Sequence, residues 1–515
     1  MHPIHHARTQ PAKAAYIMAA TGETVTYGQL HERANQGAHL FRSLGLKRGD
    51  SVAVFMENSP RYFEVLFATE RSGLYITCIS SKLTAGEIEY IVRDSGSKVF
   101  IASSGVAAVA TEAAALFPDL PLYMCDGAVE PFASFEDARA PFPTTMIDDP
   151  SPGMTMLYSS GTTGRPKGVA NSAFAAGVPP EVYELMAAGM VNIGFPPKGR
   201  TLLCGPGYHS AQWAFSFFPL IGGSSVVMQK RFVPEEMLEL IDRHAITNVH
   251  LVPTQFVRAL RVDEERKSAF DGSSLSFVLH GAAPCSPDVK RQMIEWWGPK
   301  ITEYYGATEG GVVSMISAAE WLTRPGSVGK PMSNMTVRIV AEEGDDASTG
   351  GAGVIHVRNA MGTDFVYLGE PEKTAEAHSV AGFFTLGDIG YLDDEGYLFL
   401  SDRKIDMIIS GGVNIYPAEI EGVLSGHPLV VDAAVFGVPN EEFGEEVKAA
   451  LQLVPGTTWS DELAADVTSY VRERLAGYKV PRSWDIVEEL PRSEAGKLLK
   501  RQIRAPYWEG AGRSI

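Results

Sequence analysis

Helical and strand-like patterns of apolar residues alternate along the first part of the chain. Residues 27–45 place apolar side chains three and four positions apart and end at Gly45, which predicts an amphipathic helix. Residues 51–56, SVAVFM, form a short apolar run that predicts a buried strand, and the same two patterns return at 61–73 and 74–80. This alternation is typical of layered α/β proteins with largely parallel strands.

A second α/β stretch follows, and the pattern then changes. Residues 234–246 predict a helix that leads into a strand over 248–254. Residues 326–400 contain short strands separated by turns, which indicates a small β-rich subdomain. From about residue 405 the chain carries further strands and helices, enough for a separate α+β domain. We therefore expect an α/β protein with a large N-terminal part and a small C-terminal domain.

Composition narrows the class of protein. A chain of 515 residues exceeds what one hydrophobic core usually supports, so two or more domains are expected. The net charge of −18 disfavours a nucleic acid or an anionic membrane as partner. The four cysteines, Cys78, Cys125, Cys204 and Cys285, form no C-x-x-C pair and predict neither a zinc site nor a disulfide framework. With no apolar segment of transmembrane length and no secretory leader pattern, we expect a cytoplasmic protein.

The loop at 158–169, YSSGTTGRPKGV, offers backbone N–H groups, hydroxyls and the charge of Lys167, which together suit polyphosphate oxygens. It is not a Walker A loop. Pro166 precedes the lysine where that loop needs glycine, and Gly168 follows it where Ser or Thr would bind Mg²⁺. Composition alone leaves a flexible linker as the alternative.

Five further stretches stand in order behind this loop: PGYHSAQW at 206–213, EYYGATEGG at 303–311, FFTLGDIGYLDDEGYL at 383–398, SDRKIDMIISGGVNIYPAEIE at 401–421 and LPRSEAGKLLKR at 490–501. Taken together, the six stretches resemble the adenylate-forming superfamily of acyl-CoA synthetases, luciferases and peptide-synthetase adenylation domains, over nearly the whole chain. The nearest resemblance is to a bacterial AMP-forming acyl-CoA synthetase. It implies an AMP-binding domain over 1–402, with the ATP and acyl pockets, and a mobile C-terminal domain over 403–515.

The implied reaction uses ATP, Mg²⁺ and coenzyme A with a small carboxylic acid. The carboxylate attacks the α-phosphate of ATP and displaces pyrophosphate, which gives acyl-AMP. The thiol of CoA then attacks the acyl carbon and displaces AMP, which gives acyl-CoA. Such chemistry needs positioning and neutralisation of charge rather than a protein nucleophile. The resemblance leaves homodimerisation open.

The resemblance also implies roles for individual residues. The β and γ phosphates of ATP are expected to meet Ser159, Ser160, Gly161, Thr162, Thr163, Gly164 and Lys167, with Thr163 also taking part in catalysis. Tyr305 and Gly306 would border the adenine and acyl pockets, Thr308 would contact the α-phosphate, and Glu309 would bind Mg²⁺ and act in catalysis.

Further implied contacts come from the last three stretches. Asp388 would accept from the ribose hydroxyls and Arg403 would make a second nucleotide contact, although Leu386 stands where the family usually has Thr. Lys497 would reach the bridging oxygens during adenylation, whereas Lys500, one turn on, is expected to be solvated. The small residues Gly411 and Gly412 would line the pantetheine tunnel. The usual hinge position, with Asp or Lys in the family, holds Ile405.

The acid substrate is less determined. The stretch 206–215 lacks the aspartate that pairs with an amino-acid ammonium group, and His209 matches the pocket histidine of acyl-CoA synthetases, with a catalytic role. Trp213 is interpreted either as a gate to an acyl tunnel or as core packing. Gly281 and Ala282 would form a second wall with room for a bulky acyl group, so fatty, aryl-propenoic and steroid side-chain acids stay open.

Three other functions remain as alternatives. An acyl-AMP ligase would pass its product to a carrier protein, but it would often carry an insertion before the C-terminal domain, and none is visible at 398–405. A luciferase-type oxygenase would oxidise the acyl-AMP. A non-catalytic homologue is disfavoured because the charged residues of all the motifs are present.

Overall fold

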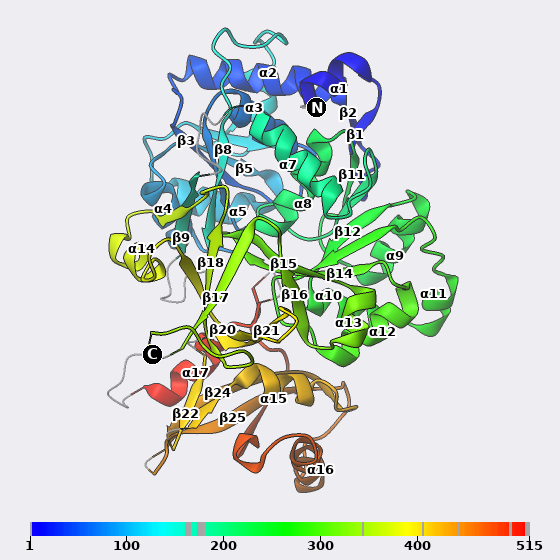
Figure 1. The fold of residues 1–515 in the computed structure, drawn as a ribbon. Coiled ribbons are helices and arrows are strands. Elements are labelled where there is room, and N and C mark those ends of the chain that lie inside the picture. The colour runs from blue at the N-terminus through cyan, green and yellow to red at the C-terminus, as the bar shows by residue number, and fades with distance from the viewer. Residues whose placement is uncertain are drawn as a thin grey trace. The chain divides into compact units, whose positions relative to one another are not determined.

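The computed structural model describes residues 3–159, 166–172, 179, 181–341, 344–403, 406–411, 413–440, 442–493 and 497–509. The chain forms two compact units (Figure 1). Unit 1 comprises Met1–Leu251, Val262–Leu279 and Thr363–Glu376, and unit 2 comprises Val252–Arg261, His280–Gly362 and Ala377–Ile515. Each unit combines sheets with covering helices, so the predicted α/β class is confirmed.

Two groups of strands form the framework of unit 1. The first has the order β19 (Phe365–Tyr367), β9 (Lys167–Asn171), β8 (Met154–Ser159), β4 (Tyr75–Ile79), β3 (Ser51–Phe55), β5 (Ser97–Ser103), β6 (Leu122–Cys125), β7 (Ala133–Ser134). The second has the order β13 (Phe277–His280), β12 (Asn248–Leu251), β10 (Arg200–Leu203), β11 (Ser225–Met228), β1 (Ala14–Met18), β2 (Thr24–Thr26). Neighbours are parallel from β8 to β7 and from β12 through β10 and β11 to β1, as the alternating pattern predicts.

The helices of unit 1 are α1 (Pro3–Thr9), α2 (Tyr27–Ser43), α3 (Tyr62–Arg71), α4 (Ala85–Asp94), α5 (Ala107–Ala114), α6 (Phe135–Arg139), α7 (Glu181–Asn192), α8 (Ser210–Ile221), α9 (Pro234–Arg243), α11 (Glu264–Ala269) and α14 (Pro371–Ala377). The helix predicted over 27–45 is α2. It begins at a capping box of Thr26 and Gln29 and is followed by Gly45 with φ of 80°. The strand predicted over 248–254 ends earlier, at Leu251, because Pro253 opens the next helix.

Unit 2 also contains two groups of strands. The first has the order β17 (Met335–Val340), β18 (Gly353–Asn359), β20 (Phe384–Leu392), β21 (Leu398–Arg403), β16 (Ser327–Pro331), β15 (Gly311–Ser317), β14 (Ile301–Ala307). The second has the order β23 (Val413–Ile415), β22 (Ile408–Ser410), β25 (Gly444–Leu453), β24 (Val430–Asn440), and β26 (Ser483–Val487) also pairs with β25. The helices are α10 (Pro253–Leu260), α12 (Pro287–Trp297), α13 (Ala318–Thr323), α15 (Pro417–Leu424), α16 (Asp461–Arg472) and α17 (Lys500–Trp508).

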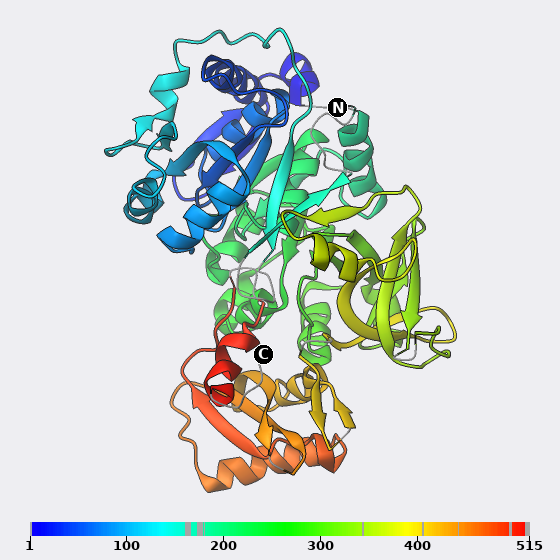
Figure 2. The same cartoon turned by 90° about the vertical axis from the view of Figure 1, so that its left-hand side faces the viewer.

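The C-terminal sheet of unit 2 has its own core. Helices α15 and α17 pack against β24, and both views show them beside the long pair β24 and β25 (Figures 1 and 2). The buried side chains include Ile420, Val435 and Val467, from helix, strand and helix respectively. This core gives the C-terminal sheet packing of its own, whereas the domain division at 402/403 stays a prediction.

Two sequence-based expectations about the whole chain can be compared with the described residues. All four cysteines are free. No helix among the described residues combines the length and apolar character needed to cross a bilayer.

Candidate active site

Three of the predicted nucleotide residues meet in unit 2. Tyr305, on β14, donates its hydroxyl hydrogen bond to Asp388 Oδ2 at 2.7 Å. Asp388, on β20, is the cross-strand partner of Arg403 on β21. The side chain of Arg403 lies outside the described residues. Motifs that are far apart in the sequence therefore converge because β14, β20 and β21 belong to one group of strands.

Gly306 has a structural reason to be glycine. A Cβ at this position would lie 2.0 Å from the carbonyl oxygen of Gly311, on the neighbouring strand β15. The close approach lets β14 turn directly into β15. Thr308 and Glu309 lie in that turn, and both residues are partly exposed.

The candidate phosphate loop is described at its two ends. Ser159 ends β8 and pairs with Lys167, the first residue of β9. Lys167 Nζ lies 5.1 Å from the centroid of the Tyr367 ring. The side chain of Ser159 and all of Ser160, Gly161, Thr162, Thr163 and Gly164 lie outside the described residues. Their phosphate contacts stay a prediction.

Lys497 pairs with Ser493 in the C-terminal sheet region. The backbone N–H of Ser493 donates to the Lys497 carbonyl at 2.8 Å, and the Lys497 N–H donates to Ser493 Oγ at 3.2 Å. The expectation for Lys500 was wrong. Its Nζ lies 2.9 Å from Glu421 Oε1, and its side chain is only 10% exposed. Lys500 is therefore a paired residue that holds α17 to α15.

Gly411 follows strand β22 at the tip of the β22–β23 hairpin. Its φ of 57° is in the left-handed region, and its N–H donates to the Phe443 carbonyl at 2.8 Å. Gly412 lies outside the described residues, as does Ile405. The geometry explains a glycine at 411 as a tight turn, and the tunnel role of the pair stays a prediction.

His209 is the first part of a two-histidine arrangement in unit 1. It occupies the N-cap position of α8 without a side-chain capping hydrogen bond, and burial lowers its pKa to about 4. His250, on β12, is buried, and burial together with His209 lowers its pKa to about 3. Gln212 Nε2 lies 2.9 Å from His250 Nδ1, and Gln212 Oε1 accepts from the Gly205 N–H at 3.3 Å. Both rings are therefore neutral at pH 7.

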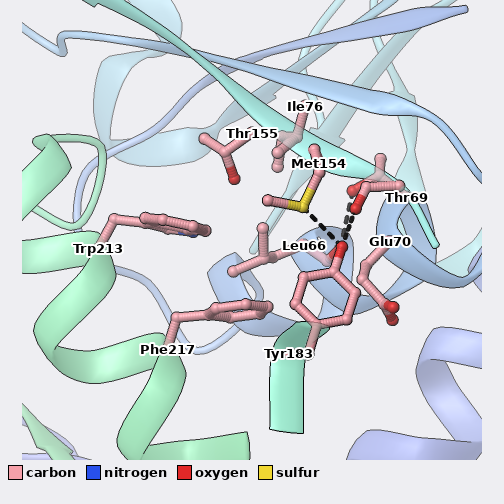
Figure 3. A pocket seen from close by; sticks show the side chains of 10 residues that line it. Leu66, Thr69, Glu70, Ile76, Met154, Thr155, Tyr183, Trp213 and Phe217 are labelled. Atoms are coloured by element: carbon pink, nitrogen blue, oxygen red, sulfur yellow. Dashed lines mark hydrogen bonds between the residues drawn. The ribbon is translucent and has the colours of Figure 1, made fainter. Parts of the chain in front are cut away.

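Trp213 lies in the core of unit 1. Its side chain is 2% exposed and stacks on Phe217, with centroids 5.0 Å apart. It borders a small cavity that Leu66 and Tyr183 also line, and the Tyr183 hydroxyl points to Met154 Sδ at 2.6 Å (Figure 3). The cavity offers about 10 Å³ for water-molecule centres, which is the room that one water needs. This environment favours the packing alternative over the gate.

Gly281 and Ala282 follow strand β13. A Cβ at Gly281 would lie 2.5 Å from Tyr304 Cε1, so the tyrosine ring already fills the space beside this glycine. Ala282 is exposed and has a φ of 67°. The small size of Gly281 therefore serves the packing of Tyr304, and an acyl wall formed by these residues stays a prediction.

Sequence reasoning did not find two polar pairs beside the candidate site residues. Tyr158 precedes Ser159 and donates to Asp94 Oδ2 at 2.7 Å, which ties the stem of the candidate phosphate loop to α4. Lys290, on α12, is buried and lies 2.5 Å from Glu303 Oε2 on β14, two residues before Tyr305. The motif EYYGATEGG includes Glu303, but only the fold reveals its partner.

Comparison with known proteins places the chain in a family. Residues 4–364 match the AMP-binding enzyme model, and residues 419–497 match the model of the AMP-binding enzyme C-terminal domain. A feruloyl-CoA synthase of Amycolatopsis sp is 33% identical, with 98% of each chain covered. A fatty acid–[acyl-carrier-protein] ligase, ScoC of Streptomyces coeruleorubidus, is 31% identical, with 99% of this chain and 96% of the relative covered. The crystal structure of the anthranilate CoA ligase AuaEII in complex with anthranoyl-AMP is similar with a TM-score of 0.88 and 25% identity, covering 99% of this chain and 97% of that one.

Proposed function

The chain belongs to the AMP-binding enzyme family, and from that premise we propose that it joins a hydrophobic carboxylic acid to coenzyme A by way of an acyl-AMP intermediate. The reaction class is that of an AMP-forming acid–thiol ligase using ATP and CoA. The observation that carries the proposal is the match of both family models, combined with the convergence of Tyr305, Asp388 and Arg403 from three separate motifs.

Each candidate residue would contact a different part of ATP during adenylation. Asp388 would accept hydrogen bonds from the ribose hydroxyls, with its carboxylate oriented by the Tyr305 hydroxyl. Thr308 would contact the α-phosphate, and the loop with Lys167 would hold the β and γ phosphates. Lys497 would neutralise the charge that develops on the bridging oxygens as the carboxylate attacks. These groups stabilise and position, and none of them forms a covalent bond.

The donor set fits Mg²⁺ bound mainly through phosphate. Among the described residues, no three His, Cys, Asp or Glu side chains gather into a metal site. Mg²⁺ is commonly held by one or two carboxylates together with substrate phosphates and water. Glu309, in the partly exposed turn after β14, is the carboxylate that would serve. When bound, the ion would neutralise phosphate charge.

Thioester formation would use a part of the C-terminal domain that does not contain Lys497. We propose the division into residues 1–402 and 403–515, with Lys497 needed for adenylation and the Gly411 hairpin lining the path of the CoA thiol. The two functions lie on different parts of the same small sheet region, so a rotation of that domain would exchange them.

An uncharged acyl group fits the histidine region best. The helix that follows His209 carries no acidic residue to pair with an ammonium group. His209 and His250 are neutral at pH 7 because burial lowers their pKa values, so they offer no positive charge to a second carboxylate. We therefore propose a monocarboxylic fatty or aryl acid, like those in the names of the feruloyl and fatty-acid relatives, rather than a dicarboxylic acid such as the 2-succinylbenzoate of other relatives.

The test is a panel of carboxylic acids with ATP, Mg²⁺ and CoA, measured by AMP release. We expect a fatty or aryl-propenoic acid to support CoA-dependent AMP formation and a dicarboxylic acid to be poor. A second candidate, transfer to a carrier protein, is favoured by the similarity to ScoC. AMP release that requires a phosphopantetheinyl carrier protein, and does not respond to CoA, would establish the second candidate and reject the first.

A further inference from the structure

A bidentate ion pair joins Asp432 of β24 to Arg492, in the segment that leads to Lys497. Arg492 donates from Nε to Asp432 Oδ2 at 2.8 Å and from Nη2 to Asp432 Oδ1 at 2.8 Å. The two side chains are 25% and 22% exposed, so the pair is largely shielded from solvent. Parallel hydrogen bonds of this kind restrain both distance and orientation, which a single contact between flexible side chains does not.

The backbone transmits this restraint to Lys497. Arg492 forms an antiparallel bridge with Leu498, the residue after the lysine. On either side of that bridge, the Leu499 N–H donates to the Pro491 carbonyl at 2.8 Å and the Ser493 N–H donates to the Lys497 carbonyl at 2.8 Å. Lys497 is therefore adjacent in the chain to Leu498, the bridge partner of Arg492.

The same segment also makes apolar contacts with β24. Leu490 is 3% exposed and, with Leu498, packs against Ala434 and Phe436 of β24. Apolar packing keeps the segment close to the sheet but is not directional. The Asp432–Arg492 pair adds directional hydrogen bonds between β24 and this segment.

We propose that Asp432 and Arg492 are positioning residues for Lys497 in the adenylation half-reaction. The inference rests on the proposed role of Lys497. A lysine that must reach phosphate oxygens as charge develops depends on where its backbone starts, and a displacement of about 1 Å can cost on the order of a hundredfold in rate. Thioester formation does not use Lys497, so the pair contributes to one half-reaction and not to the other.

The experiment measures both half-reactions in the full-length enzyme. Acyl-AMP formation is followed by ATP–pyrophosphate exchange, and thioester formation is followed from supplied acyl-AMP and CoA. We expect Arg492→Met and Asp432→Asn to lower the exchange rate by about tenfold or more, and to leave the thioester rate within about twofold. Arg492→Lys keeps the charge but loses the bidentate geometry, and it should be intermediate.

A matched control comes from another ion pair of the same sheet region. Lys448 Nζ lies 2.8 Å from Asp485 Oδ1, and these side chains are 10% and 31% exposed. Asp485→Asn removes a comparable partly buried pair, together with the hydrogen bond that Asp485 accepts from Tyr507 of α17, but it leaves the Arg492–Asp432 hydrogen bonds in place, so it should affect the two half-reactions equally. Arg492 variants are the primary test, because the Asp432 carboxylate also attracts the Arg261 guanidinium, which donates to the Val431 carbonyl at 3.2 Å, so Asp432→Asn would change two interactions.

Lys497→Ala, assayed in parallel, separates two kinds of failure. If Lys497→Ala lowers both half-reactions equally, the proposed role of the lysine is wrong and the inference falls with it. Suppose instead that Lys497→Ala lowers adenylation only. If Arg492→Met then lowers both half-reactions equally, or changes neither of them, the role of Lys497 stands but the positioning role of Asp432 and Arg492 is overturned. A lowered melting temperature with an equal loss in both half-reactions would likewise assign the pair a structural role only.

Discussion

The buried pair Lys290–Glu303 allows a quantitative prediction about the strand that carries the nucleotide residues. Lys290 is fully buried, its Nζ lies 2.5 Å from Glu303 Oε2, and it also lies 4.7 Å from the centroid of the Trp321 ring. Burial lowers the pKa of Lys290 and raises that of Glu303, while each charge partly opposes the shift in its partner. Lys290→Met leaves the Glu303 carboxylate buried with its principal counter-charge removed.

Two estimates limit the loss of unfolding free energy that Lys290→Met should cause. Breaking a buried pair by removing one partner typically costs about 3–5 kcal/mol. The carboxyl can instead take up a proton, which at pH 7 costs at most about 4 kcal/mol for a group of ordinary pKa and less for one whose pKa is raised. We therefore expect Lys290→Met to lose about 3–4 kcal/mol at pH 7. Because the folded pKa of Glu303 lies above its unfolded value, this loss should shrink as the pH falls toward the ordinary carboxyl pKa.

The assay is denaturant unfolding of the full chain, with Glu303→Gln and the double variant completing a double-mutant cycle. The double variant removes both charges and should recover most of the loss, which gives a coupling energy of about 2 kcal/mol or more. Arg291→Met is the matched control, since the neighbouring Arg291–Asp288 pair of α12 is 44% and 56% exposed and should contribute less than about 1 kcal/mol. Additive losses in the cycle, or an equal loss in the control, would refute the reasoning.

Three further predictions concern the core residue Trp213, the candidate Mg²⁺ ligand Glu309 and the buried His250. Trp213→Ala should lose about 3–5 kcal/mol of stability and lower kcat/KM alike for acids of every length; a changed length profile at unchanged stability would instead identify a gate. Glu309→Gln should raise the Mg²⁺ concentration needed for half-maximal activity, because an amide is a weaker ligand than a carboxylate; an unchanged Mg²⁺ titration would remove Glu309 from the metal site. Since the folded pKa of His250, about 3, lies below its unfolded value, stability should fall as the pH drops below about 6.5. His250→Phe should flatten that slope in urea unfolding by up to about 1.4 kcal/mol per pH unit, and an unchanged slope would contradict the lowered pKa.

Local sequence patterns predicted a helix or strand correctly where all the signals for it lie close together in the sequence. The helix α2 follows from its apolar spacing, its capping residues and Gly45, and all of these signals lie within twenty or so neighbouring positions. The predicted end of β12 was wrong. Val252 continues the apolar run, so the sequence pattern extends past Leu251, but the strand ends there because Pro253 is the first residue of the next helix.

The candidate site was only partly predictable, because its contacts join distant segments. Tyr305 and Asp388 could each be identified from their motifs, but their hydrogen bond depends on how β14 and β20 come together. Lys500 shows the same limit, since nothing near it in the sequence indicates the pairing with Glu421.

Trp213 and Gly281 show that residue type leaves the role open. A tryptophan four positions after a pocket histidine is compatible with a gate, yet its neighbours Phe217 and Phe218 enclose it in a core. A glycine is compatible with room for a substrate, yet the Tyr304 ring occupies that room. Packing of this kind is decided by side chains from several elements, which a single sequence does not bring together.

The central claim, that the carboxylate attacks the α-phosphate of ATP, is tested most directly by isotope transfer. An accepted acid labelled with ¹⁸O in both carboxyl oxygens is incubated with the enzyme, ATP, Mg²⁺ and CoA, and the products are analysed by mass spectrometry. The account predicts that one ¹⁸O appears in AMP for each acyl-CoA formed, that the other stays in the acyl group, and that pyrophosphate is unlabelled. Label in inorganic phosphate together with ADP, or acyl-CoA formed without label in AMP, would contradict it.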